Sequence, residues 1–476
     1  MPERSTVQPP LRFVPPRFNR LLFRAVSTIY PLYLRFGLNI RRLDVEGIET
    51  LVEHYRRFQQ KKIRLIVAFR HPHLDDGAIM AWLLSGFVRR SARSDWKRAG
   101  RQRLRFPSFA YFIYDRGAPL WAGPFIAWLL PRVGAMSVFR GKLDSHGLDN
   151  IRSAVVNGDQ PIAIAPEGAV SYNERTAAPL ESGVARFAFW CVGDLLDANR
   201  DEEVIIVPVT PSYRHGRDAS RRLRQVASYL ERECGLPQAD DRMSPARLRA
   251  VASRLFRTAE LFYRRFYAES AASIELPETE VSASGQYGAN GFRAPEQGRI
   301  EAIVQAALLS AEHRLGLPST GTPIRRVRRI EQASWDRIYR EDIGDIASLC
   351  PLDRALADRI ALETSLTMRH LQLADIMVYL SELAIPDGAS IDEMAEAAAN
   401  LAGVVARLEG GDISATPRLG SRSITYRIGE PISVSSRWEA YRENRQQAVD
   451  ELMHSLRGEF QRLSSPGKTA TEGRSL

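Results

Sequence analysis

Apolar runs alternate with segments of helical period through the first half of the chain. Buried strands are predicted where apolar residues follow one another with little interruption, at 61–70 (KKIRLIVAFR), 161–168 (PIAIAPEG) and 203–213 (EVIIVPVTPSY). Apolar residues recur at helical spacing in the segments 75–87, 148–157 and 181–196. Strands that alternate with helices are typical of an α/β fold. We therefore expect an α/β core with a mostly parallel sheet flanked by helices.

The second half of the chain changes to long basic helical segments. They extend from about residue 216 to 420 and are broken by a Gly/Ser-rich linker at 282–291. A strand pattern returns only at 423–434 (SITYRIGEPISV). This order predicts a helical region inserted into the α/β domain, and a separate C-terminal domain that ends in a strand is the alternative. The expected segments are N-terminal membrane-associating helices at 1–42, the core at 43–215, the helical insertion at 216–420, the returning strand and closing helix at 421–464, and a disordered tail at 465–476.

The N-terminal segment 17–29 has an amphipathic pattern. Its apolar side comprises Phe18, Leu21, Leu22, Ala25 and Ile29, and its other side comprises Arg17, Arg20 and Arg24. We expect Pro31 to bend or end this helix. A basic helix of this kind can lie in a membrane interface, and packing on its own domain fits the pattern equally well. The longer apolar stretch 118–139 is interrupted by three prolines and an arginine, so we expect it to be buried or interfacial rather than membrane-spanning.

Charge and cysteine content narrow the class of partner and the compartment. The chain of 476 residues has a net charge of +10, mostly from arginine, which favours anionic partners such as a lipid surface, a phosphorylated substrate or nucleic acid. A basic surface kept for solubility is the alternative. Three cysteines, at 191, 234 and 350, form no C-x-x-C pair and indicate neither a disulfide framework nor a cysteine metal site. With no signal-peptide pattern, a location inside the cell is expected.

The heptapeptide RHPHLDD, at 70–76, lies on the predicted turn from a buried strand to a helix. Such turns often carry functional groups in open α/β sheets. One candidate chemistry is a zinc site built from His73, Asp75 and Asp76. The segment HPHLDD resembles the first motif of zinc-dependent sugar deacetylases, but no second histidine-rich motif supplies a further ligand. The other is a pair in which His71 takes a proton and Asp76 orients its ring. A helix cap without catalytic function is the plainest alternative.

Four blocks in order favour the second chemistry. The spacing H-x-x-x-x-D joins His71 and Asp76, VGAMSVFR ends in Arg140, a P-E-G turn contains Glu167 and Gly168, and the strand VIIVPV contains Pro208. Together these blocks resemble the glycerolipid acyltransferase family, typified by 1-acylglycerol-3-phosphate acyltransferases. The resemblance covers roughly 43–213 and 424–463 and leaves the helical insertion unexplained.

The resemblance implies a function and a role for each residue. His71 would deprotonate an acceptor hydroxyl that attacks the thioester of acyl-CoA or acyl carrier protein, and Asp76 would orient its ring. Arg140 would bind the phosphate of a lysophospholipid or glycerol phosphate, and Glu167, Gly168 and Pro208 would shape the acceptor site. No metal or other cofactor is implied. The enzyme would serve phospholipid synthesis at the cytoplasmic face of a membrane, peripheral or monotopic, bound to an anionic surface and not to nucleic acid.

The blocks also depart from the family pattern. Arg70 stands where the family usually has asparagine or serine, and His73 stands where it often has serine. Phe139 stands where an aspartate commonly precedes the arginine. The residues after P-E-G lack the usual threonine, arginine and serine, and Arg175 and Lys142 are the candidates to replace that arginine. A basic binding protein without enzymatic activity is a further alternative. In that case clusters such as RRVRR, at 325–329, would bind the partner, whereas a solvated helix face is the default expectation.

Overall fold

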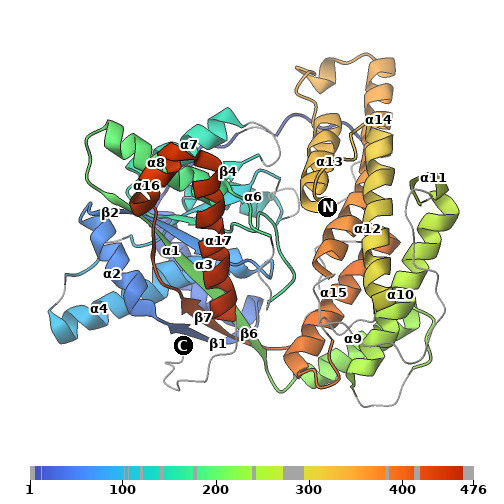
Figure 1. Cartoon of the computed structure of the whole chain (residues 1–476), viewed down its shortest axis with the longest axis horizontal. Helices are drawn as coiled ribbons and strands as arrows, with labels where there is room; N and C mark the ends of the chain where they lie inside the picture. Colours follow the sequence, from blue (N-terminus) through green and yellow to red (C-terminus); the bar gives the residue numbers. More distant parts are fainter. Residues whose placement is uncertain are drawn as a thin grey trace. The chain divides into compact units, whose positions relative to one another are not determined.

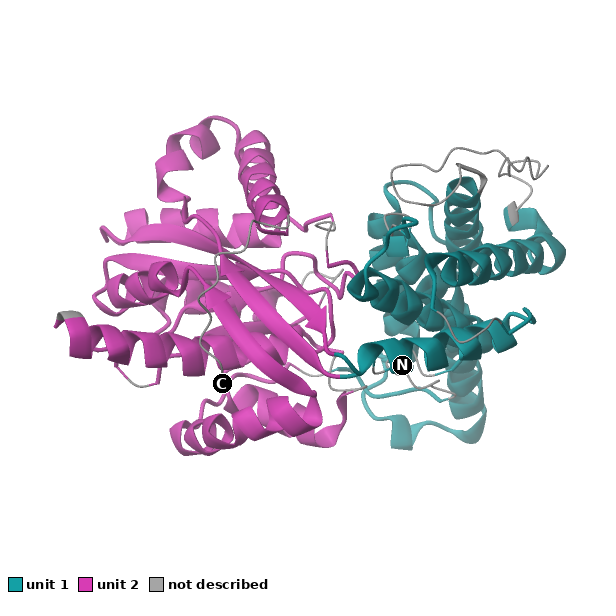
Figure 2. Cartoon of the chain, turned by 90° about the horizontal axis from the view of Figure 1, so that it is seen from below, with its two compact units in different colours: residues 1–12, 140–143, 217–420 teal, residues 13–139, 144–216, 421–476 magenta. Residues whose placement is uncertain are grey.

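The computed structural model separates the chain into two compact units (Figure 2). The α/β unit comprises 13–139, 144–216 and 421–476, and the helical unit comprises 1–12, 140–143 and 217–420. The structure describes residues 6–11, 13–100, 102–105, 107–117, 122–139, 144–174, 179–238, 243–271, 294–380, 385–411, 417 and 419–464. The expected linker at 282–291 and the expected tail at 465–476 lie outside these residues.

Within the described residues of the α/β unit, eight strands form one mixed sheet in the order β1-β7-β6-β2-β5-β3-β4, and β8 pairs with β6 (Figure 1). The β2–β6, β2–β5, β3–β5, β3–β4 and β1–β7 pairs are parallel, and β6 is antiparallel to both β7 and β8. The prediction of an α/β fold with a mostly parallel sheet is therefore confirmed. The strands are β1 Ile40–Glu46, β2 Ile63–Phe69, β3 Tyr111–Asp115, β4 Met136–Val138, β5 Ile162–Ile164, β6 Glu203–His215, β7 Arg422–Ile428 and β8 Ile432–Ser433.

Helices cover both faces of this sheet, which explains why the central strands are apolar without alternation. In β2, Leu65, Val67 and Phe69 join one core, whereas Ile66 and Ala68 join the other. The first core is closed by η1 Tyr33–Gly37, α2 Ile48–Gln59, α3 Asp76–Trp82, η2 Leu83–Phe87 and α4 Val88–Ala99. The second core is closed by α7 Ser145–Asn157, α8 Gly183–Asp197, α16 Trp438–Glu443 and α17 Arg445–Ser464.

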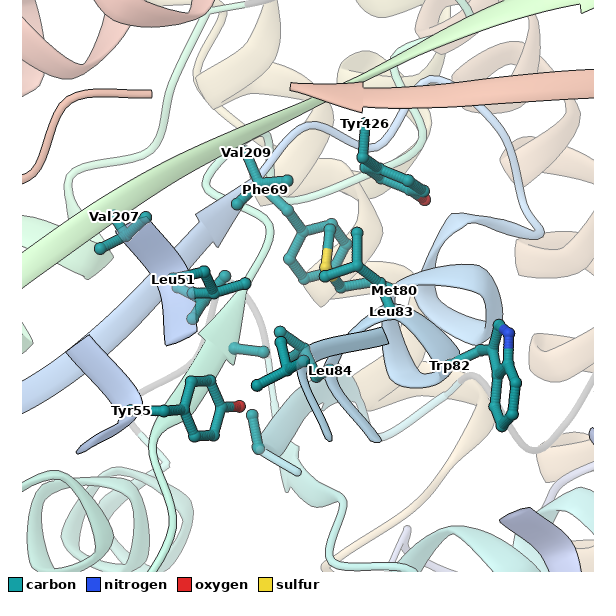
Figure 3. Close-up of a cluster of buried hydrophobic side chains, with 14 of the residues drawn as sticks. Leu51, Tyr55, Phe69, Met80, Trp82, Leu83, Leu84, Val207, Val209 and Tyr426 are labelled. Atoms are coloured by element: carbon teal, nitrogen blue, oxygen red, sulfur yellow. The ribbon is translucent and has the colours of Figure 1, made fainter. Parts of the chain in front are cut away.

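The first core lies directly beneath the turn that carries the heptapeptide. Figure 3 shows Phe69 of β2, Met80 of α3, Val209 of β6 and Tyr426 of β7 gathered in this core. Each of these side chains is less than a tenth exposed. Because interiors are close-packed, strand β2 and helix α3 have little freedom to move relative to one another.

Strand β6 is long because it pairs with different neighbours along its length. Its first half pairs with β2 and β8, and its second half, from Val209 to His215, pairs with β7. Pro208 lies opposite Ala68 of β2, and its carbonyl oxygen accepts a hydrogen bond of 2.8 Å from Gly429 N–H. Pro208 therefore lies at the point where β6 changes its antiparallel partner from β8 to β7. Because neither pairing needs a hydrogen bond from this position, the missing N–H of proline is tolerated.

The helical unit is built from long amphipathic helices that bury their apolar faces on one another. Its helices are α9 Ala219–Glu233, α10 Pro245–Phe266, α11 Ala268–Ala271, α12 Ala294–Leu315, α13 Pro323–Ile338, η3 Ile346–Ser348, α14 Pro351–Leu380 and α15 Ile391–Glu409. The N-terminus belongs to it as well, because Gln8 forms a bridge with Tyr339. The predicted segment 1–42 is thus divided between the two units after residue 12.

The first helix, α1 Arg20–Leu32, begins at Asn19, whose side chain accepts hydrogen bonds from two backbone N–H groups of the first turn. Pro31 does not end it, because the chain continues helically and passes into the π-helical turn η1. The helix packs through Phe23 and through Tyr30, whose hydroxyl donates to Ala78 O. Of the predicted apolar side, Leu21 and Ile29 are exposed, whereas Phe18 stacks on Phe109 and Leu22 is half-buried. Among the described residues, no helix has the length and apolarity needed to cross a bilayer.

Candidate functional site

The heptapeptide forms the turn between β2 and α3, as the sequence predicts. His71 follows the carboxyl end of β2, and Asp76 is the first residue of α3. The P-E-G turn follows the carboxyl end of β5, the parallel neighbour of β2. Two of the predicted blocks therefore meet at one edge of the sheet, where ligands bind in open α/β folds.

His71 and Asp76 face one another across this turn. His71 Nδ1 lies 3.4 Å from Asp76 Oδ2, and the imidazole is 22% exposed whereas the carboxylate is fully buried. None of the described residues makes a hydrogen bond to the opposite nitrogen, Nε2. A carboxylate at Nδ1 favours the tautomer in which Nε2 carries the lone pair, so this nitrogen can accept a proton. The 3.4 Å distance is long, as is common for catalytic hydrogen bonds in the absence of substrate.

Asp76 is held by groups on three sides. His73 N–H donates to its Oδ2 at 2.6 Å, and the Tyr213 hydroxyl donates to its Oδ1. Burial and the negative charge of Asp76 keep the pKa of Tyr213 well above its ordinary value, so the phenol stays protonated and remains a donor. Helix capping does not explain the turn, because Asp75 is the N-cap residue and its side chain makes no capping hydrogen bond.

A buried ion pair fixes the backbone of the turn. Arg70 Nε lies 3.1 Å from Glu167 Oε1, and neither side chain is exposed. The other oxygen of Glu167 accepts a 2.6 Å hydrogen bond from His71 N–H. The Arg70 guanidinium also donates to the carbonyl oxygens of Asn173 and Glu174 and to the hydroxyl of Ser464. Glu167 therefore positions His71 from below, and its fully buried carboxylate is not placed to contact an acceptor.

The remaining predicted site residues have different positions. Gly168 has a left-handed backbone with φ of +70°, which favours glycine at this turn, and a Cβ there would displace the end of the Glu181 side chain. Pro208 lies within the sheet, beside β2, and acts on the site only through the backbone. Arg140 lies outside the described residues, as do its proposed replacements Lys142 and Arg175.

A second imidazole and carboxylate pair flanks the first. His73 Nε2 lies 2.8 Å from Glu174 Oε1, and the His73 ring packs edge-on against Tyr213. Burial disfavours the charged imidazole, but the hydrogen bond to Glu174 and the charges of Glu174 and Asp76 outweigh it and raise the pKa of His73. The pair therefore favours a protonated His73.

The three residues of the zinc alternative are directed at different partners. Asp75 forms an ion pair of 2.6 Å with Arg422, His73 binds Glu174, and Asp76 accepts from Tyr213. A cation on Asp75 would have to compete with Arg422. Among the described residues, no group of three histidine, cysteine, aspartate or glutamate side chains is arranged to hold a metal ion.

Four residues of this network were not predicted as part of the site: Arg70, Glu174, Tyr213 and Arg422. Arg70 carries a signal, because a charge placed directly after a buried strand must find a partner. Arg422 carries a weaker one, since it precedes Ile424 and Tyr426 at strand period, on the buried side of β7. Tyr213 and Glu174 carry none, because their roles depend on how β6 and the P-E-G turn approach α3.

The basic cluster 325–329 is less available than its composition suggests. Arg326 is buried and forms an ion pair of 2.6 Å with Glu312, so the expectation of a solvated face is wrong at this position. Arg329 binds the same carboxylate at 3.3 Å, and Arg328 lies 3.2 Å from Glu331. Three of the five residues are thus engaged with acidic residues of the helical unit.

Comparison of the chain with protein-family models and with curated proteins finds no match.

Proposed function

We propose that this protein is an acyltransferase that moves a fatty acyl group from a thioester to the hydroxyl of a lysophospholipid or glycerol phosphate. The observation that carries the proposal is the His71–Asp76 pair at the carboxyl edge of the sheet, with Nδ1 at 3.4 Å from the carboxylate and Nε2 open. The order of the four sequence blocks supports the same reaction. The class of acceptor rests on the resemblance, since Arg140 is outside the described residues.

The reaction follows from the two ring nitrogens. His71 Nε2 takes the proton of the acceptor hydroxyl as its oxygen forms a bond to the thioester carbon. The tetrahedral intermediate collapses, the carbon–sulfur bond breaks, and the imidazolium returns the proton to the leaving thiolate. Asp76 stabilises the imidazolium and holds its orientation, and Glu167 keeps the His71 backbone in place. The products are an ester and a free thiol, with no covalent enzyme intermediate.

An apolar and basic surface of the α/β unit supports binding to an anionic membrane. On α1 and η1, Leu21 is 80% exposed, Ile29 61% and Phe36 75%. Nearby, helix α6 Pro124–Arg132 exposes two aromatic residues, and its Pro131 O accepts a hydrogen bond from Arg17 N–H. Exposed apolar side chains flanked by arginine match an interfacial helix, whose lipid substrates reside in the bilayer. We place the enzyme at the cytoplasmic face, peripheral or monotopic.

Acyl transfer from radiolabelled acyl-CoA and acyl carrier protein to a panel of lysophospholipids and glycerol 3-phosphate tests the reaction. We expect transfer by the wild-type protein and by a chelator-treated sample, and a loss of about 10²- to 10⁴-fold in His71→Ala. His54→Ala is the matched control, because His54 lies on α2 and binds only the carbonyl of Thr50 among described residues. No transfer to any acceptor, together with stoichiometric zinc, would refute the proposal and favour the deacetylase.

Sedimentation with vesicles tests the membrane surface separately. The double variant Leu21→Glu, Ile29→Glu should bind anionic vesicles at least about tenfold more weakly, because it places two charges in the apolar face. Leu196→Glu is the control, since Leu196 is also more than half exposed but lies on α8. Equal binding by the two variants would rule out α1 as the membrane-binding element.

A further inference from the structure

The first half of α14 in the helical unit exposes an apolar face. Leu352 and Leu356 are 67% and 51% exposed, and Ile360, Leu362 and Leu366 are 40%, 39% and 41% exposed. At this spacing the five side chains share one side of the helix. The opposite side is buried within the unit through Ala357, Ala361, Thr364 and Met368. The helix therefore has a second apolar surface that its own unit does not use.

One ion pair crosses this face. Arg359 Nε lies 2.9 Å from Glu363 Oε1, one helical turn apart, and both side chains are largely exposed. The two residues are equally distant from position 361. So are Leu356 and Leu366, and so are Ile360 and Leu362. These four apolar residues are thus arranged symmetrically about position 361, with the positive and negative charges exchanged, and Leu352 extends the face at one end.

We propose that this face of α14 binds the same face of a second copy of the chain, so that the protein is a homodimer. In two antiparallel helices related by a two-fold axis that crosses their contact, residues at equal distances on either side of the axis face one another. An axis that crosses the exposed face at the level of position 361 places Leu356 opposite Leu366 and Arg359 opposite Glu363 of the second copy. Each of these four apolar residues then meets an apolar residue, and each charge meets its opposite, whereas Leu352 lies beyond the symmetric set.

The charge balance favours a second copy over a membrane. An interfacial helix is typically flanked by basic residues, as α1 is. On α14 the flanking Arg354 is paired with Asp358 at 3.1 Å, and Arg359 with Glu363. The face is therefore close to neutral and self-complementary. This proposal does not depend on acyl transfer, because the interface lies in the helical unit.

Sedimentation equilibrium of the full chain over a concentration series tests the dimer. Wild-type protein should dimerise, and Arg359→Glu or Glu363→Arg alone should raise the dissociation constant about tenfold or more, because like charges then meet across the axis. The double variant Arg359→Glu, Glu363→Arg should restore dimerisation. A two-fold antiparallel contact predicts this rescue of dimerisation, whereas the ion pair within α14, which the double variant also restores, affects only the stability of the helix.

Leu356→Glu should abolish the dimer, whereas Leu196→Glu on α8 should leave it unchanged. Circular dichroism verifies that the variants keep their helical content, as expected for exposed positions. A wild-type protein that is monomeric at every concentration would overturn the proposal. So would a dimer that survives Leu356→Glu, or a double variant no better than the single ones.

Discussion

Both units contain buried arginine–glutamate pairs, and Arg70–Glu167 of the α/β unit differs from Arg326–Glu312 of the helical unit in what else the carboxylate holds. In the α/β unit, Glu167 binds Arg70 with one oxygen and the backbone N–H of His71 with the other. In the helical unit, Glu312 receives Arg326 on both oxygens, at 2.8 Å and 2.6 Å, and Arg329 at 3.3 Å. Both carboxylates are inaccessible.

Burial of a charged pair therefore does not by itself mark a functional site. The pair in the helical unit joins α12 to α13, and among the described residues its further hydrogen bonds go to the Gln305 side chain and, through Arg329, to loop carbonyls. The pair in the α/β unit joins the P-E-G turn to the backbone of the proposed base. The partner of the second carboxylate oxygen distinguishes a pair that only joins helices from one that also holds the backbone of the proposed base.

The largest expected effects come from neutralising these two glutamates. Glu167→Gln and Glu312→Gln each leave a buried arginine without its counter-charge, which should lower the free energy of unfolding by about 3–5 kcal/mol. Only Glu167→Gln should also lower kcat per folded enzyme, by about tenfold or more, because the His71 backbone loses its strongest anchor. Chemical unfolding and acyl-transfer kinetics measure the two quantities.

Equal loss of kcat in both variants would contradict this distinction. Circular dichroism at the assay temperature provides the control, since the rate must be normalised to folded protein. An unchanged kcat in Glu167→Gln would show that the P-E-G turn does not position His71.

The buried His370 of the helical unit and the half-buried His73 of the α/β unit should respond to pH in opposite directions. His370 packs against Tyr263 and Tyr267, and burial together with the charge of Arg314 lowers its pKa to about 4. Between pH 6.5 and 4 the unfolded chain therefore binds a proton that the folded chain does not. As the pH is lowered through this window, the free energy of unfolding should therefore decrease because of His370, by up to about 3 kcal/mol. Chemical unfolding of wild type and His370→Gln at pH 7, 5 and 4 measures it.

His73 should show the opposite sign. Its folded pKa is raised, so the stability it contributes is present in full below the ordinary histidine pKa near 6.5 and is lost as pH rises through the folded value. His73→Gln should remove this loss on the alkaline side, whereas His370→Gln should not. If His73→Gln and His370→Gln changed the pH dependence of the unfolding free energy in the same way, the difference between the two environments would be contradicted.

Two buried tyrosines give the smallest contrast. Tyr213 donates to the Asp76 carboxylate, and the Tyr263 hydroxyl is 2.9 Å from His370 Nδ1. Tyr213→Phe should cost about 1.5–3 kcal/mol, because the acceptor is charged, and Tyr263→Phe about 1 kcal/mol. Only Tyr213→Phe should change the kcat of acyl transfer. Loss of activity in Tyr263→Phe, at unchanged helical content, would break the comparison.

Much of the architecture is predictable from local pattern. The buried strand before RHPHLDD and the apolar run 203–213 identify the centre of the sheet, because both are apolar on two faces. The return of a strand pattern after residue 420 predicts β7 as a strand. Periodicity alone does not show that this strand lies between β1 and β6 in the sheet. The continuation of α1 through Pro31 is less predictable, because a proline usually ends or bends a helix, whereas this helix passes into a π-helical turn.

The site is predictable only where its residues are close in sequence. His71 and Asp76 share one turn, so their spacing predicts that they meet. Tyr213 reaches Asp76 only because of the register of β6 with β2, and Arg422 reaches Asp75 only after the helical insertion returns the chain. Such contacts depend on tertiary packing and leave no local signal in the sequence.

A double-mutant cycle on His71 and Asp76 tests the central claim most directly. The kcat of acyl transfer is measured for His71→Ala, Asp76→Asn and the double variant, with folding verified by circular dichroism. If the two residues act as one unit, the double variant should be no slower than the slower single variant, because without His71 there is no ring to orient. Losses that multiply, or a His71→Ala variant with wild-type kcat, would contradict the proposed mechanism.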